Sequence, residues 1–138
     1  MDQGEPFVKV MALDFGSART GVAVSDPTGT LARPLDVVED VLSRPGQTKL
    51  MSLIRSEQPE RIVVGMPLTL RGERGEQARA TEDFVARLAA EVDVPIETYD
   101  ERFTTGLAQQ TPSKAPEDAR AAAHLLSSYL EWSSAARA

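Results

Sequence analysis

The chain has 138 residues and a mass of 14.9 kDa, which favours a single domain with a substantial core. It has no cysteine and one histidine, which excludes disulfides and thiolate chemistry and argues against multi-histidine metal sites. The formal net charge of −6 argues against a general electrostatic attraction to nucleic acid or membranes and makes carboxylates the most available catalytic groups. With no signal peptide and no apolar run of roughly 18 residues, we expect a cytoplasmic protein without a membrane partner.

Apolar periodicity predicts eight elements. Short apolar runs bounded by glycine, proline or aspartate are typical of strands, and apolar residues three and four apart are typical of helices. In chain order we expect strands over residues 7–13, 20–26 and 31–33, a helix over 46–57, a strand over 61–65, a helix over 76–92, a strand over 95–99 and a helix over 117–132, with a frayed tail over 133–138.

The order of these elements predicts an α/β fold. The first three strands follow one another through short turns, so they should pair antiparallel. Strands and helices then alternate, which predicts parallel pairing through right-handed crossovers. We therefore expect one domain over residues 1–138, with its core over about 7–132: a mixed five-stranded sheet of three antiparallel opening strands followed by parallel strands, flanked by helices.

Three acidic positions fall where such a sheet would collect them. Asp14 closes the first strand, Asp100 and Glu101 close the last one, and Asp118 lies on the apolar stripe at the start of the final helix. Taken singly, Asp14 fits a turn former, Glu101 a paired or solvated residue, and Asp118 a helix cap. Together they indicate an all-oxygen site for one or two Mg²⁺ or Mn²⁺ ions, which is suited to phosphodiester hydrolysis.

At these residues the chain resembles the YqgF family, also called RuvX, which consists of small bacterial proteins with an RNase H-like fold. The resemblance covers nearly the whole chain, from about Val8 to Glu131, and its most specific feature is Asp-Glu-Arg-x-Thr-Thr together with Val-Val-Gly-x-Pro-Leu. It implies that Asp14, Glu101 and Asp118 are catalytic, metal-binding carboxylates. The blocks that carry it are residues 13–26, 62–68 and 100–105, and Asp118 with Ala121, Ala122, Tyr129 and Leu130.

The resemblance also implies a function, namely a divalent-metal-dependent nuclease. Two substrates stay open: the 5′ end of precursor 16S rRNA, which we favour, and a four-way DNA (Holliday) junction cut by a homodimer. The pattern Asp-x-Gly-x-x-x-x-Gly from Asp14 to Gly21 also resembles the phosphate-binding hairpin of the actin and sugar-kinase superfamily. An ATP-binding module is therefore a less favoured alternative, as is an RNA- or ribosome-binding protein that cuts nothing.

Basic residues near these motifs are candidates for contact with phosphates. Arg19 lies in the first turn, beside the expected metal site, and Arg71 and Arg74 lie in a glycine-containing loop. Such cations bind the nucleic-acid backbone without reading its sequence. A solvated loop explains Arg71 and Arg74 equally well, and for Arg102 an internal ion pair with Asp100 or another carboxylate is the favoured alternative.

The segment before the last aspartate departs from the family pattern. Family members usually carry a longer, often basic segment between the Thr-Thr pair and that aspartate. Here only residues 106–117 intervene, with Lys114 as their one cation. Lys114 is therefore a further candidate for nucleic-acid contact. We expect this shorter segment to bind the substrate differently from the longer segment of other family members.

Overall fold

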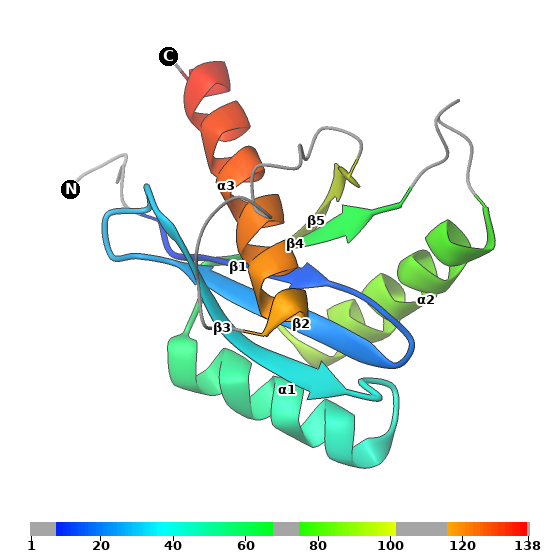
Figure 1. Cartoon of the computed structure of the whole chain (residues 1–138). Coiled ribbons are helices and arrows are strands. Elements are labelled where there is room, and N and C mark those ends of the chain that lie inside the picture. Colours follow the sequence, from blue (N-terminus) through cyan, green and yellow to red (C-terminus); the bar gives the residue numbers. More distant parts are fainter. Residues whose placement is uncertain (1–7, 68–74, 102–115, 138) are drawn as a thin grey trace.

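The computed structural model describes residues 8–67, 75–101 and 116–137. At its centre lies a five-stranded sheet with the strand order β3-β2-β1-β4-β5 (Figure 1). The first three strands pair antiparallel, and the last two pair in parallel on the other side of β1. This is the mixed sheet predicted from the sequence. Its strands are β1 (Val10–Asp14), β2 (Arg19–Ser25), β3 (Ala32–Glu39), β4 (Arg61–Met66) and β5 (Ile96–Asp100).

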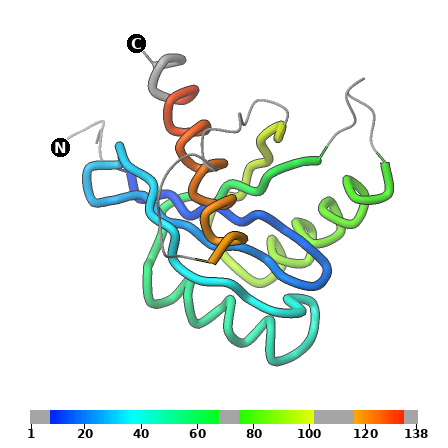
Figure 2. The backbone as a smooth tube through the Cα atoms, in the orientation of Figure 1, coloured from blue at the N-terminus to red at the C-terminus, as the bar shows by residue number. Residues whose placement is uncertain are grey.

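Three helices cover the two faces of the sheet. Helices α1 (Arg44–Glu57) and α2 (Glu76–Glu91) pack on one face, and α3 (Glu117–Arg137) crosses the other (Figures 1 and 2). Each face has its own apolar core, one including Leu50 of α1 and Phe84 of α2, the other including Leu125 of α3. None of the described helices is both long and apolar enough to cross a membrane.

Strand β1 distributes its side chains between the two cores. Successive residues of a strand point to opposite faces. Met11 and Leu13 accordingly join the core under α1 and α2, whereas Val10 and Ala12 join the core under α3. The next position in this alternation is Asp14, which places its carboxyl group on the α3 face at the end of the strand.

Strand β3 is longer than expected, because the sequence predicts a strand over residues 31–33 only. Pro34 and Asp36 resemble strand breakers, yet both pair with β2. A proline is tolerated here because β3 is an edge strand, where a missing N–H need not interrupt a ladder. A shift of register between Val22 and Ala23 of β2 accommodates the irregularity.

The chain after Trp132 also differs from the expectation of a frayed tail. Helix α3 continues to Arg137. Ser133 is buried, and its hydroxyl donates a hydrogen bond to the Leu130 carbonyl at 3.3 Å. The helix therefore extends past residue 132, where the sequence predicts a frayed tail, and Ser133 is the residue of this extension that is shown to be buried.

Candidate active site

Asp14 lies between two glycines of the neighbouring strands. The register pairs Asp14 with Gly21 of β2. Leu13 pairs with Val64, so Gly65 of β4 lies beside Asp14 on its other side. Because neither glycine has a side chain, the α3 face of the sheet is open around the Asp14 carboxyl group.

Asp118 and Glu101 lie over these two glycines. A Cβ atom built on Gly21 would lie 1.9 Å from the Asp118 carbonyl oxygen, so the start of α3 rests directly on β2. A Cβ atom built on Gly65 would lie 2.7 Å from Oε2 of Glu101, so the Glu101 side chain fills the space above β4. The glycines thus allow residues 101 and 118 to approach Asp14.

Asp14 and Glu101 share a hydrogen bond between their side chains. Burial raises the pKa of Glu101 to about 7, with further contributions from the Asp14 charge and hydrogen bond and from the Asp100 charge. Burial also raises the pKa of Asp14, and the Asp118 charge adds to this, although the hydrogen bond from Glu101 acts in the opposite direction. The pair is therefore most stable when Glu101 is protonated and its carboxyl O–H donates a hydrogen bond to an ionised Asp14.

Asp118 has a cationic partner. Nε of Arg19, the first residue of β2, donates a hydrogen bond to Oδ2 of Asp118 at 2.9 Å. Asp118 lies in the first turn of α3, where the helix dipole favours a negative charge. The Arg19 side chain is 61% exposed and that of Asp118 is 38% exposed, so this ion pair lies at the open edge of the site.

The three carboxyl groups fit a hard divalent cation by their donor chemistry, because all of their ligand atoms are oxygens. They are not arranged as a ready ligand set. Within residues 8–67, 75–101 and 116–137, no three Asp, Glu or His side chains form a group that could hold a metal ion. Asp14 and Glu101 are hydrogen-bonded to each other, and Asp118 is hydrogen-bonded to Arg19. The assignment of these carboxylates as metal ligands stays a prediction.

The other predicted nucleic-acid contacts cannot be placed in this site. Arg71, Arg74, Arg102 and Lys114 lie outside the residues that the structure describes. Their assignment as phosphate contacts stays a prediction. Arg19 is the predicted contact that the structure brings next to the carboxylates.

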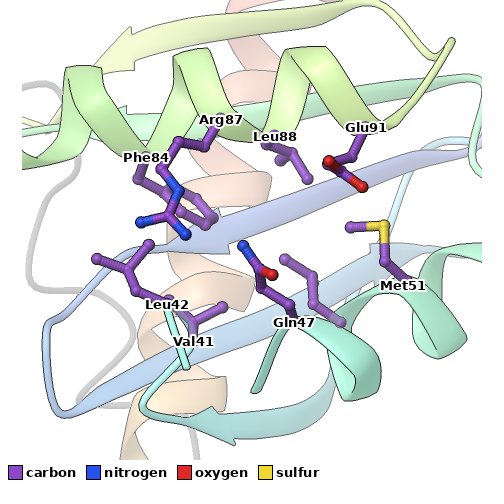
Figure 3. Close-up of a pocket in the computed structure, with 9 residues that line it drawn as sticks. Val41, Leu42, Gln47, Met51, Phe84, Arg87, Leu88 and Glu91 are labelled. Carbon is purple, nitrogen blue, oxygen red and sulfur yellow. The ribbon is translucent and has the colours of Figure 1, made fainter. Parts of the chain in front are cut away.

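A small cavity lies on the opposite face of the sheet, between α1 and α2 (Figure 3). Its volume is about 20 Å³, and Phe84 and Leu88 contribute to its apolar lining. In Figure 3 Arg87 of α2 lies opposite Gln47 of α1, and Glu91 of α2 lies opposite Met51 of α1. Because the sheet separates this cavity from Asp14, it has no part in the carboxylate site.

The sequence interpretation missed the role of the two glycines. Gly21 and Gly65 lie inside strands, as the predicted strands over residues 20–26 and 61–65 imply, but the sequence interpretation gave neither glycine a part in the site. The signal was the placement of Gly21 and Gly65 one residue away from runs of valine and alanine, where a missing side chain leaves a gap in an otherwise filled sheet face. What fills each gap depends on distant segments of the chain.

Comparison with known proteins identifies the relatives of this chain. Residues 8–132 match the model of the RuvX family, described as Holliday junction resolvase. The chain belongs to this family. A protein of Sulfurihydrogenibium sp. (strain YO3AOP1), named "Putative pre-16S rRNA nuclease", is 40% identical over 89% of this chain and 90% of its own length. A protein of Rubrobacter xylanophilus with the same name is 43% identical over 91% of this chain and 94% of its own length.

Solved structures with the same fold include two resolvases. RuvC of T. thermophilus in complex with a Holliday junction substrate superposes with a TM-score of 0.66 and 16% identity, covering 95% of this chain and 98% of that one. The Fowlpox virus resolvase in complex with Holliday junction DNA gives a TM-score of 0.51 and 10% identity, covering 94% and 97%. These neighbours confirm the RNase H-like fold of this RuvX family member.

Proposed function

We propose that this RuvX protein is a divalent-metal-dependent nuclease that processes the 5′ end of precursor 16S rRNA. The observation that carries the proposal is the half-buried Asp14–Glu101 pair, with Asp118 close enough to raise the pKa of Asp14. Carboxyl groups are placed together in this way, against their mutual repulsion, chiefly at functional sites. The names of the curated relatives support ribosomal RNA as the substrate.

In this proposal Asp14, Glu101 and Asp118 hold Mg²⁺ or Mn²⁺. The ion would supply a Lewis acid that polarises the scissile phosphate and lowers the pKa of a bound water. Asp14 is fixed by the β1 ladder, and Gly21 and Gly65 keep side chains out of the space around it. Glu101, with its pKa near neutrality, can release its proton when positive charge enters the site. The N-terminus of α3, next to Asp118, adds a partial positive charge that favours a phosphate.

Cleavage of a Holliday junction is the second candidate function. It is favoured by the description of the RuvX family and by the fold shared with two resolvases that were solved with junction DNA. Resolution needs two symmetric cuts and therefore two copies of the site related by a two-fold axis. A protein that is monomeric in solution and on the junction would count against this function.

The test is cleavage of a labelled precursor 16S rRNA leader by pure protein with Mn²⁺ or Mg²⁺. We expect cuts near the mature 5′ end, and Asp14→Asn should reduce the rate at least 100-fold because it removes a charged oxygen from the site. Glu97→Gln is the control: Glu97 is a carboxylate of β5 that accepts a hydrogen bond from the Tyr129 hydroxyl.

Depletion of the protein in cells provides the matching biological test. Precursor 16S rRNA with an extended 5′ end should accumulate, and wild-type protein, but not Asp14→Asn, should restore maturation. Efficient cutting of four-way DNA with no cutting of the leader RNA would favour the junction function. Cleavage of neither nucleic acid under any divalent metal would contradict the nuclease proposal.

A further inference from the structure

The contact between Arg19 and Asp118 joins two segments that are 99 residues apart in the chain. Their backbones are held together independently of the ion pair, because Gly21 allows β2 to touch the Asp118 carbonyl. The ion pair itself is a single hydrogen bond, Nε to Oδ2, between two partly exposed side chains. The Asp118 carboxyl group can therefore change its partner while the start of α3 stays where it is.

Because Arg19 is hydrogen-bonded to Asp118, its guanidinium would compete with any cation that binds this carboxylate. A guanidinium and a divalent cation carry charges of the same sign, so they repel each other when both approach one carboxylate. A partly exposed ion pair contributes little net free energy, so the guanidinium is displaced easily. A doubly charged ion that also contacts Asp14 and Glu101 has the stronger attraction for this site.

A displaced Arg19 would lie at the same edge of the site with its donors available. The guanidinium carries five N–H donors in a planar arrangement that matches two oxygens of a phosphate. The formal net charge of −6 gives the protein no overall attraction for a polyanion, so a cation that lies at the site itself matters more. A cation that becomes available only after the metal has bound would couple the binding of metal and nucleic acid.

We infer that Arg19 is a positioning residue that changes partners: it holds Asp118 in the absence of a divalent cation and contacts the nucleic-acid backbone once the cation has taken its place. This inference rests on the proposed function and adds the order of events to it. The metal and the nucleic acid then bind with positive coupling through one side chain.

The first experiment measures binding of Mn²⁺ alone by calorimetry, in wild type, Arg19→Gln, Arg19→Lys and Arg33→Gln. Removing the competing charge in Arg19→Gln should tighten Mn²⁺ binding about three- to tenfold, whereas Arg19→Lys should stay near wild type. Arg33→Gln is the matched control. Arg33 lies near the start of β3, as Arg19 lies at the start of β2. Its side chain is 55% exposed and pairs with Glu57 at 3.9 Å, so its loss should leave Mn²⁺ binding unchanged.

The second experiment measures how binding of single-stranded leader RNA depends on KCl, in EDTA and in Ca²⁺. For wild type, Ca²⁺ should steepen the plot of log K against log salt by about 0.7, the slope expected for one additional phosphate contact on a single strand. The Arg19→Gln protein should lose this increment, and Arg33→Gln should keep it. This readout does not depend on cleavage.

The possible outcomes separate the inference from the function on which it rests. If Arg19 only anchors α3, Arg19→Gln will lower the melting temperature and weaken Mn²⁺ binding, which overturns the exchange of partners. Unchanged Mn²⁺ affinity in Arg19→Gln overturns it as well. If the wild type itself binds no Mn²⁺, the metal site and the proposed function fail, and the inference fails with them.

Discussion

The two hydrogen-bonded carboxyl groups of Asp14 and Glu101 share one proton at the centre of the candidate site. The pKa of Glu101 is raised to about 7, whereas an unfolded glutamate has an ordinary pKa of 4.5. Between these two values the folded protein keeps a proton that the unfolded chain releases. The contribution of Glu101 to stability is therefore fully present below about pH 4.5 and is lost as the pH rises through about 7.

Replacing Glu101 by Gln tests this linkage, because the amide stays neutral at every pH. Relative to wild type in EDTA, we expect Glu101→Gln to gain free energy of unfolding as the pH rises from 5 to 8. The gain should be about 1 to 2 kcal/mol, which is the full linkage value reduced for the partial exposure of the carboxyl group. Urea denaturation at several pH values measures the difference.

Asp26 provides a control of opposite sign. Hydrogen bonds from the Leu31 backbone and the Thr28 side chain, among others, lower its pKa. Its stabilising contribution is present above the unfolded pKa and is lost as the pH falls through the folded one. Asp26→Asn should therefore be less stable than wild type at pH 8 and approach it in acid. A pH-independent difference for Glu101→Gln would show that the two carboxyl groups do not share a proton.

At the scale of elements, the site is built by close contacts between a helix, a side chain and the sheet. A Cβ at Gly21 would overlap the backbone of α3, which cannot move without shifting the whole helix. A Cβ at Gly65 would meet Oε2 and Cγ of the Glu101 side chain and the Leu125 Cδ2 atom, which are side-chain atoms that can move without shifting a helix. The two glycines should therefore respond differently to the same substitution.

We expect Gly21→Ala to lower the free energy of unfolding by about 2 to 3 kcal/mol and to weaken Mn²⁺ binding, because it displaces Asp118. Gly65→Ala should cost less than about 1 kcal/mol yet also weaken Mn²⁺ binding, because it displaces Glu101. The control is Gly75→Ala, where an added Cβ meets nothing within 4 Å. Thermal unfolding and calorimetry give both quantities. Equal stability of Gly21→Ala and Gly75→Ala would contradict the close approach of α3.

The same elements show what the sequence could predict. Strand β4 and helix α2 were predicted nearly to their ends, because their apolar patterns reflect burial on one or both faces. Most of β3 was missed, because Pro34 is acceptable only at a sheet edge and the sequence does not say which strand is the edge. Periodicity placed Asp118 on the buried stripe of its helix, but not next to Arg19. That contact depends on how α3 crosses the sheet.

At the scale of the whole molecule, charge opposes the proposed substrate. In the proposed function a protein with a net charge of −6 meets a polyanion, at a site where Glu101 and Asp118 both act on the pKa of Asp14. A divalent cation would resolve this conflict locally, because it would add two positive charges where the carboxylates and the phosphate meet. Binding of the cation and stability of the fold should therefore be linked.

Divalent metal should raise the melting temperature of the wild type. In the proposed function the cation binds only the folded protein, because the unfolded chain separates Asp14, Glu101 and Asp118. Stability should then increase with the ratio of metal concentration to Kd. At a concentration about 100 times Kd, the gain of about 2.7 kcal/mol corresponds to roughly 5 to 10 °C for a chain of this size. Differential scanning fluorimetry with Mn²⁺, Mg²⁺ or EDTA measures the shift.

The Asp14→Asn variant should reverse the pattern, because it relieves repulsion in EDTA but removes a metal ligand. Its melting temperature without metal should equal or exceed that of wild type, and its shift with metal should be small. A metal shift of the same size in both proteins would place the cation away from Asp14, and no shift in the wild type at 10 mM of either metal would contradict the carboxylate site.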